Sequence, residues 1–254
     1  MRARGIGPWV QLLAAVVLGA AVVIGTVVTA NAVDYIKTFN TSLLTVTGQA
    51  QMLVTSDQVK WTGDFFVNAQ PEALQAGYTQ MSKDQAAVQA FLQSRGVAAA
   101  DITISPVTMS QIYVDCAQNP SACGKFNIAG YHLDQAVTVR SGDVQGVTRI
   151  AQDVTPLVSE GVAFSTQSME YYYTKLDTLR GKLTAEATAE AQSRAQQIAA
   201  ATGRKVGQLV SVQTQPLQLT PVNSSQVSNN GQYDTTTIQK QLTAIVQAQF
   251  RLPQ

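Results

Sequence analysis

The sequence has little of what catalysis and metal binding use most. Its 254 residues include one histidine, His132, and two cysteines, Cys116 and Cys123. A structural zinc site usually needs four nitrogen, sulfur or oxygen ligands, and a cysteine–histidine pair needs residues that this chain can hardly supply. The G-x-S-x-G elbow, the Walker A motif and the G-x-G-x-x-G fingerprint do not occur either. We therefore predict no catalytic residue, no cofactor-binding residue and no metal ligand, and we interpret the protein as not an enzyme.

Charge is scarce as well. Charged residues make up 13% of the chain, and 17 basic against 16 acidic side chains give a net charge of +1. A protein that binds nucleic acid needs a basic surface to displace counterions from phosphates, and no such excess exists here. We therefore expect no nucleic-acid partner. A surface with so little net charge repels its own copies weakly, which permits self-association.

The longest apolar run, residues 9–29, reads WVQLLAAVVLGAAVVIGTVVT, with Gln11 as its only strongly polar side chain. About 20 apolar residues in a helix match the ~30 Å hydrocarbon core of a bilayer. Arg2 and Arg4 precede the run, and the first charge after it is Asp34. The positive-inside rule therefore predicts a single-pass anchor in a bacterial inner membrane, with the N-terminus in the cytoplasm and the rest in the periplasm.

This anchor divides the predicted chain. Residues 1–8 form a short cytoplasmic N-terminus, residues 30–42 a linker and residues 43–254 one periplasmic domain. Ala30-Asn31-Ala32 supports an alternative, because its small-x-small pattern fits cleavage of a signal peptide and would leave a soluble periplasmic protein. The apolar core of a signal peptide is usually shorter, about 7–15 residues, which favours the anchor.

The two cysteines agree with an oxidising compartment. Cys116 and Cys123 enclose the short sequence AQNPSA, in which Asn119-Pro120 favours a turn. The spacing differs from the C-x-x-C of a typical redox pair. We predict a local structural disulfide between them, contributing at most ~2–3 kcal/mol because its loop is short.

Hydrophobic periodicity predicts an α+β domain. Alternating apolar residues predict strands over residues 44–54, 59–67, 102–114, 126–140, 164–174, 206–212 and 242–252. Helical spacing predicts helices over 71–95, 144–160 and 178–202. The order ββαββαβαββ indicates mainly antiparallel sheet with helices packed on one face. We expect the first two strands to form a hairpin.

Several local signals refine this order. Pro106 predicts a bulge or an edge within its strand, and Pro156 predicts a kinked or shortened helix. The polar segment 216–239 is expected to be a long surface loop. The inner face of the last helix is predicted to be rich in alanine, which would let the helix lie close to a sheet: Leu179, Leu183, Ala187, Ala191, Ala195 and Ile198.

Two groups of polar residues are weak candidates for chemistry. By alternation, His132 lies on the polar face of its strand, which makes a functional role improbable. Glu186 and Glu190 are one helical turn apart, but Arg194 follows at the same spacing. We interpret this pattern as a solvated helix face with an i,i+4 ion pair rather than as a pair of catalytic carboxylates.

The consecutive tyrosines Tyr171, Tyr172 and Tyr173 are the most unusual local feature. Neighbouring side chains on a strand point to opposite faces, so at most two of the three share a side. A purely structural interpretation places one tyrosine in the core and two on the opposite face. Exposed tyrosines are favoured at binding surfaces, so we keep the three as candidates for an interface.

Three stretches together resemble the SIMPL-domain family. They are TVTGQAQMLVTSDQVKWTGDF, GYHLDQAVTVRSGDVQGVTRIAQDV and EYYYTKLDTLRGKLTAEATAEAQSRAQQIAAATGRKVGQLVSV. The resemblance covers about residues 43 to 253, and the chain departs from many relatives at the cysteine loop and at segment 216–239. It implies an exported or membrane-anchored envelope protein. Some members are linked to oxidative stress, and some are thought to self-assemble. The family has no agreed catalytic residues, so none is transferred.

Three functional hypotheses follow. The favoured one is a non-enzymatic, anchored envelope protein that forms a homo-oligomer or other protein contacts, in a setting of envelope or oxidative stress. The alternative is a soluble periplasmic module that binds a small ligand in a pocket between sheet and helices. A hydrolase with an unrecognised site is the least favoured.

Overall fold

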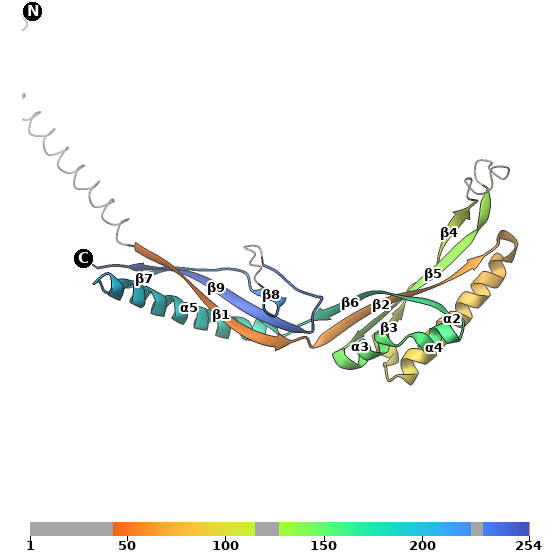
Figure 1. Cartoon of the computed structure of the whole chain (residues 1–254), viewed down its shortest axis with the longest axis horizontal. Coiled ribbons are helices and arrows are strands. Elements are labelled where there is room, and N and C mark those ends of the chain that lie inside the picture. Colours follow the sequence, from red (N-terminus) through yellow and green to blue (C-terminus); the bar gives the residue numbers. More distant parts are fainter. Residues whose placement is uncertain (1–42, 115–126, 225–230, 254) are drawn as a thin grey trace, which may run out of the picture. The chain divides into compact units, whose positions relative to one another are not determined.

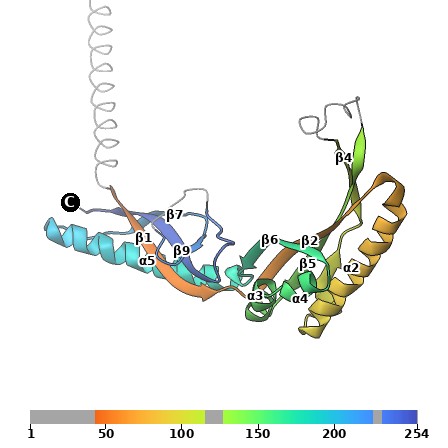
Figure 2. The same ribbon diagram turned by 45° about the vertical axis from the view of Figure 1, so that its right-hand side comes forward.

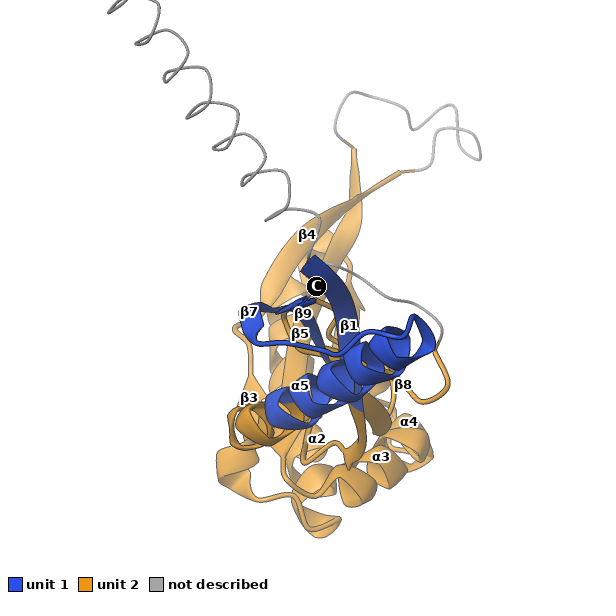
Figure 3. Ribbon diagram, turned by 90° about the vertical axis from the view of Figure 1, so that its left-hand side faces the viewer, with its two compact units in different colours: residues 1–50, 184–215, 245–254 blue, residues 51–183, 216–244 orange. Residues whose placement is uncertain are grey.

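The computed structural model describes residues 43–114, 127–224 and 231–253. The predicted anchor at 9–29 and the predicted disulfide between Cys116 and Cys123 lie outside the described residues. The chain divides into two compact units where one domain was expected (Figure 3). Among the described residues, the first unit comprises 43–50, 184–215 and 245–253, and the second comprises 51–114, 127–183, 216–224 and 231–244.

The fold is α+β with mainly antiparallel sheets, as predicted. Three elements run from one unit into the other: β1 (Leu43–Thr55), α5 (Leu176–Ala201) and β9 (Gln239–Arg251). The other strands are β2 (Gln58–Ala69), β3 (Ile102–Ile104), β4 (Thr108–Tyr113), β5 (Ile128–Ser141), β6 (Ala163–Tyr172), β7 (Leu209–Thr214) and β8 (Gln218–Pro221). The other helices are α2 (Leu74–Ser94), α3 (Val144–Gln152) and α4 (Thr155–Ser159), with 3₁₀ turns at Pro71–Ala73 and Ala99–Asp101.

The second unit is built on an antiparallel sheet of order β3-β5-β2-β6, in which β4 also pairs with β5. Helices α2, α3 and α4 pack on one face of this sheet (Figure 2). Strand β2 alternates strictly, so Val59, Trp61 and Phe65 are buried under the helices. The side chains between them point to the opposite face, away from these three helices.

The two proline signals are confirmed, because each proline interrupts its predicted element. Pro106 separates β3 from β4, because proline cannot donate a backbone hydrogen bond to the neighbouring strand. Pro156 stands in the first turn of α4, so the predicted helix is divided into α3 and α4. Asp143 caps α3, and its Oδ1 accepts a hydrogen bond from the Gly146 N–H at 2.9 Å.

The first unit packs α5 on strands of order β1-β9-β7 (Figure 1). Ala187, Ala191 and Ala195 are fully buried, as predicted. The approach is so close that a Cβ atom at Gly48 would lie 2.0 Å from the carbonyl oxygen of Ala187. Ile198 was wrongly assigned to the inner face and is 41% exposed. Its place is taken by Ala199, which follows Ala195 at the four-residue spacing of the buried stripe.

The expected hairpin between the first two strands does not form. β1 pairs with β9, whereas β2 pairs with β5 and β6. The backbone between them bonds to distant residues: Ser56 N–H donates to the Ile238 carbonyl and Asp57 N–H to the Tyr172 carbonyl, at 2.8 and 2.9 Å. These long-range bonds tie the connection between β1 and β2 to distant parts of the chain.

The segment 216–239 differs from the expected surface loop. It contains β8, which pairs with the start of β9, and Gln218, Leu219 and Thr220 of this strand are buried. Polar side chains can be buried when their hydrogen bonds are satisfied, so the polar composition of the segment did not reveal its position.

Candidate functional site

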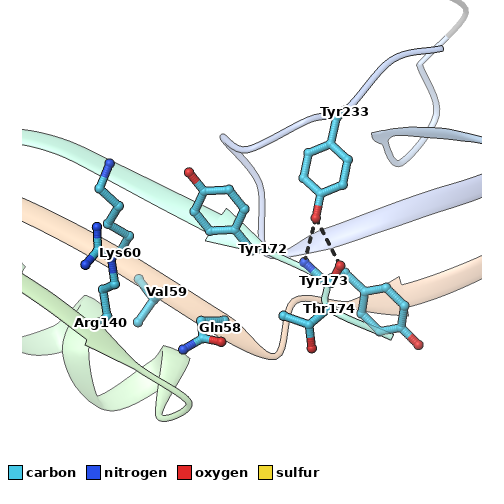
Figure 4. Close-up of a pocket in the computed structure, with 8 residues that line it drawn as sticks. All are labelled: Gln58, Val59, Lys60, Arg140, Tyr172, Tyr173, Thr174 and Tyr233. Carbon is cyan, nitrogen blue, oxygen red and sulfur yellow. Dashed lines mark hydrogen bonds between the residues drawn. The ribbon is translucent and has the colours of Figure 1, made fainter. Parts of the chain in front are cut away.

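A pocket of about 460 Å³ lies in the second unit, on the sheet face that the helices leave open (Figure 4). It is formed where β2, β5 and the end of β6 meet the segment that carries Tyr233. Its lining residues are Gln58, Val59, Lys60, Arg140, Tyr172, Tyr173, Thr174 and Tyr233.

A row of charged side chains crosses this pocket. Strand register places Lys60 of β2 opposite Glu170 of β6 on one side and Arg140 of β5 on the other. The Lys60 ammonium lies 2.9 Å from Glu170 Oε1, so these two charges form an ion pair. Arg140 makes no ion pair or hydrogen bond with another described residue. The row therefore carries one positive charge without a partner.

The Glu170 carboxylate is held by several donors. It accepts a short hydrogen bond from the Tyr172 hydroxyl, one from Lys60 at 2.9 Å and a longer one from Ser168 at 3.4 Å. The hydrogen bond from Tyr172, followed by that from Lys60, lowers the pKa of Glu170. The same bond to Glu170 raises the pKa of Tyr172. At neutral pH, Glu170 is therefore ionised and Tyr172 keeps its proton.

Aromatic rings form one wall of the pocket. The Tyr233 hydroxyl donates to the Tyr173 carbonyl at 3.0 Å and accepts from the Tyr173 N–H at 3.3 Å (Figure 4). The rings of Tyr172 and Tyr233 lie with their centroids 6.3 Å apart. Both hydroxyl groups have partners within the protein, so the rings offer mainly apolar surface to the cavity.

Tyr233 is held in place by a buried turn. On one side of it, the Leu219 N–H donates to the Gln232 carbonyl at 2.7 Å, and on the other the Asp234 N–H donates to the Leu219 carbonyl at 2.8 Å. The Lys240 side chain is fully buried, and its Nζ donates to Asp234 Oδ2 at 2.9 Å and to the Asp234 carbonyl at 2.7 Å.

The Asp234 carboxylate also accepts bonds from the Thr236 N–H and hydroxyl, at 2.9 and 2.7 Å, and from the Thr237 N–H at 3.3 Å. The Thr237 hydroxyl donates to it as well, by a shorter bond. Burial by itself raises the pKa of this carboxyl. The hydrogen bonds from Thr237, Lys240 and Thr236 outweigh that effect and hold the pKa of Asp234 well below its usual range.

In the first unit, side chains of α5 cover the outer edge of β1. The Gln49 N–H donates to Glu190 Oε2 at 3.1 Å, and Arg194 donates to the Thr47 carbonyl at 2.6 Å. Glu190 and Arg194 also pair with each other at 2.5 Å, which confirms the predicted i,i+4 ion pair. Two of the backbone groups that an added strand would need are therefore already bonded, at Thr47 and Gln49.

The other edge of these strands lacks such protection. β7 pairs only with β9 among the described strands, and its large apolar residues Leu209, Val210 and Val212 are 47, 44 and 40% exposed. No charged residue and no histidine occurs between residues 206 and 233. Natural proteins usually guard an open edge with charge or proline, and β7 contains neither.

The family model SIMPL, "Protein of unknown function (DUF541)", matches residues 44–250. The chain belongs to the SIMPL family. The resemblance read from the sequence is thereby confirmed. No curated protein matches the chain. Within the described part of this SIMPL protein, none of the helices combines the length and the apolar character needed to cross a bilayer.

The structure separates the three consecutive tyrosines of this SIMPL protein. Tyr171 is buried in the core of the second unit, with its hydroxyl 3.1 Å from Thr148 Oγ1. Tyr172 and Tyr173 line the pocket together, because β6 ends at Tyr172 and strict alternation stops there. Sequence reasoning missed Arg140 and Tyr233. Alternation places Arg140 on the polar face of β5 without indicating a role for it, and nothing in the sequence marks Tyr233.

His132 lies on the polar face of β5, as predicted. Its Nδ1 is 2.7 Å from Asn68 Oδ1, and its ring lies 5.0 Å from that of Phe66. Across residues 43–114, 127–224 and 231–253, no three His, Cys, Asp or Glu side chains come together in a way that could hold a metal ion.

Proposed function

We propose that this SIMPL protein is a non-enzymatic, membrane-anchored protein of the bacterial cell envelope that works through self-assembly. Its anchor would be residues 9–29, with the domain in the periplasm and the chain spanning the inner membrane once. The family resemblance alone suggests envelope or oxidative stress as the setting. The observation that carries the proposal is the open edge of β7.

The β7 edge has the properties of a strand that pairs with another chain. It presents unpaired backbone groups on one side and exposes Leu209, Val210 and Val212. An exposed, uncharged and apolar edge of this kind would cause uncontrolled aggregation unless something covered it. If a specific partner covers the β7 edge, the edge forms an interface and no longer promotes aggregation.

We assign a second copy of the chain as that partner. Two β7 strands can pair antiparallel about a two-fold axis, so each copy offers the same surface to the other. Neither copy carries charge between residues 206 and 233, and the whole chain has a net charge of only +1. Electrostatic repulsion between copies is therefore weak. An anchor would add to this by confining the copies to one membrane, which raises their effective concentration.

The test is native mass spectrometry of full-length protein extracted from membranes in mild detergent. We expect a defined oligomer that retains residues 1–32. Val212→Lys places a charge at the β7 edge and should shift the distribution to the monomer. Ile198→Lys is the matched control, because it adds the same charge on α5 at nearly the same exposure, 41 against 40%, and should leave the oligomer intact.

Three results would count against the proposal. A wild-type monomer would exclude self-assembly, and equal behaviour of the Val212→Lys and Ile198→Lys proteins would exclude β7 as the contact. In the latter case Ile112→Lys would test β4, a strand in which every residue is exposed. A monomer that starts at Val33 would indicate a cleaved, soluble protein and favour the ligand-binding alternative.

A further inference from the structure

We propose that the pocket of the second unit binds a small organic monoanion, with its carboxylate on Arg140 and a planar apolar body against the tyrosine rings. This site goes beyond the proposed assembly function. It lies within one unit of a single chain, on the open sheet face rather than between sheet and helices.

The charge of the ligand follows from the row of side chains across the sheet. Glu170 neutralises Lys60 through their 2.9 Å ion pair, so Arg140 is the one member of this row whose positive charge is not matched by a described carboxylate. One such charge suits a monoanion better than a dianion. A guanidinium offers two parallel N–H donors and fits the two oxygens of a carboxylate.

The pocket is poorly suited to a metal cation instead. Glu170 is the one carboxylate in the charged row, and it already accepts bonds from Lys60 and Tyr172. The neighbouring Asp57 is likewise engaged, because its two oxygens accept from the N–H and hydroxyl of Thr174 at 2.9 and 3.0 Å. The acceptors that would coordinate a cation are therefore in use, whereas the donors of Arg140 are not.

The tyrosine rings that line the pocket indicate which group the ligand carries besides its carboxylate. Tyr172 donates its hydroxyl to Glu170, and Tyr233 bonds both backbone groups of Tyr173. With the hydroxyls engaged, the ligand meets ring surfaces, which favour aromatic or other planar apolar groups. The bonds on either side of Tyr233 also fix the wall before a ligand arrives, which lowers the entropic cost of binding.

The volume sets the size of the ligand. A cavity of about 460 Å³ lies in the lower part of the range of about 300–1,000 Å³ that is usual for small-molecule sites. It accommodates one or two fused rings with a carboxylate, but no large polymer segment. Figure 4 shows Arg140 and the tyrosines on different elements around the same cavity, so one ligand can contact both.

The experiment is isothermal titration calorimetry on full-length protein in detergent. The probes are benzoate, 2-naphthoate and indole-3-acetate, each compared with its neutral primary amide. We expect saturable binding of at least one carboxylate, and binding of its amide weaker by roughly tenfold or more, because a hydrogen bond to a charged group is lost. Titration of each probe into detergent buffer without protein corrects for partition of the ring into the micelle.

Variants locate the site. Arg140→Gln should weaken carboxylate binding by about tenfold or more. Arg140→Lys should weaken it less, because lysine keeps the positive charge but lacks the two parallel N–H donors of the guanidinium. Arg149→Gln removes the same charge from an exposed position on α3 and should bind like wild type. Thermal unfolding shows whether each variant is folded. If Arg140→Gln does not fold, Arg140→Lys compared with Arg149→Lys provides the test.

Three outcomes would overturn the site: no saturable binding of any carboxylate, equal binding of a carboxylate and its amide, or equal binding by the Arg140 variants and wild type. The result is separable from the assembly proposal. A Val212→Lys protein that has lost its oligomer should still bind the carboxylate, because Val212 belongs to the first unit.

Discussion

The buried pair of Asp234 and Lys240 gives the sharpest test of how the second unit is stabilised. Asp234→Asn removes one charge and keeps the size of the side chain, which leaves the fully buried Lys240 ammonium without a counterion. Removal of one partner from a buried ion pair costs about 3–5 kcal/mol. At ~2–4 °C per kcal/mol for a unit of this size, the apparent Tm should fall by roughly 6–20 °C.

Two further variants isolate the unpaired charge as the cause. The double variant Asp234→Asn, Lys240→Met removes both charges and should recover most of the loss, because a buried pair replaced by neutral groups of similar volume is often near neutral in stability. Asp177→Asn is the control. The Asp177 side chain is 93% exposed and pairs with Arg180 at the surface, so its loss should cost less than about 1 kcal/mol.

The pH dependence has a definite sign. Because the pKa of Asp234 is lowered in the folded state, its contribution is fully present above the unfolded value, about 4, and is lost as pH falls below it. Wild type should therefore lose more stability than the double variant between about pH 5 and pH 2. Thermal unfolding followed by circular dichroism measures both effects. Equal Tm values for the Asp234→Asn and Asp177→Asn proteins would refute the reasoning.

Two smaller predictions concern packing. Gly48→Ala should destabilise by about 1–3 kcal/mol, because its Cβ would meet the backbone of α5 at Ala187. Gly181→Ala should stabilise the same helix by about 0.5–1 kcal/mol, because the space around the added methyl group is open. Urea unfolding measures both variants. If Gly48→Ala were as stable as Gly181→Ala, the close contact between Gly48 and Ala187 would be contradicted. Tyr171→Phe should cost about 0.5–1.5 kcal/mol by losing the contact with Thr148, and an unchanged Tm would show that the contact contributes nothing.

Sequence reasoning succeeded where a local signal determines local structure. Alternation located the long strands, although it missed β8. Pro106 marked the break between two strands and Pro156 the break between two helices. The alanine stripe of α5 showed which face would be buried. In each case the physical cause lies within a few residues of its effect: a missing N–H, or the period of a helix or a strand.

It failed where the outcome depends on partners far along the chain. Alternation identifies β1 as a strand but does not say that β9, nearly 200 residues later, pairs with it. Tyr233 lies in a polar segment, and the bonds that hold this segment join it to distant residues, among them Leu219 and Tyr173. The pocket is lined by residues from four separate stretches of the chain, so no pattern within one stretch could predict it.

The bonds from Glu190 and Arg194 to the β1 backbone also bear on how far an assembly can extend. A sheet with two free edges can add copies without limit and grow into a fibre. Here one edge is capped by a helix of the same chain, and only β7 is free among the described edges of these strands. If two copies pair through β7 as proposed, the Glu190 and Arg194 side chains would hinder the addition of another strand at β1. Such an arrangement would favour a finite complex over a fibre.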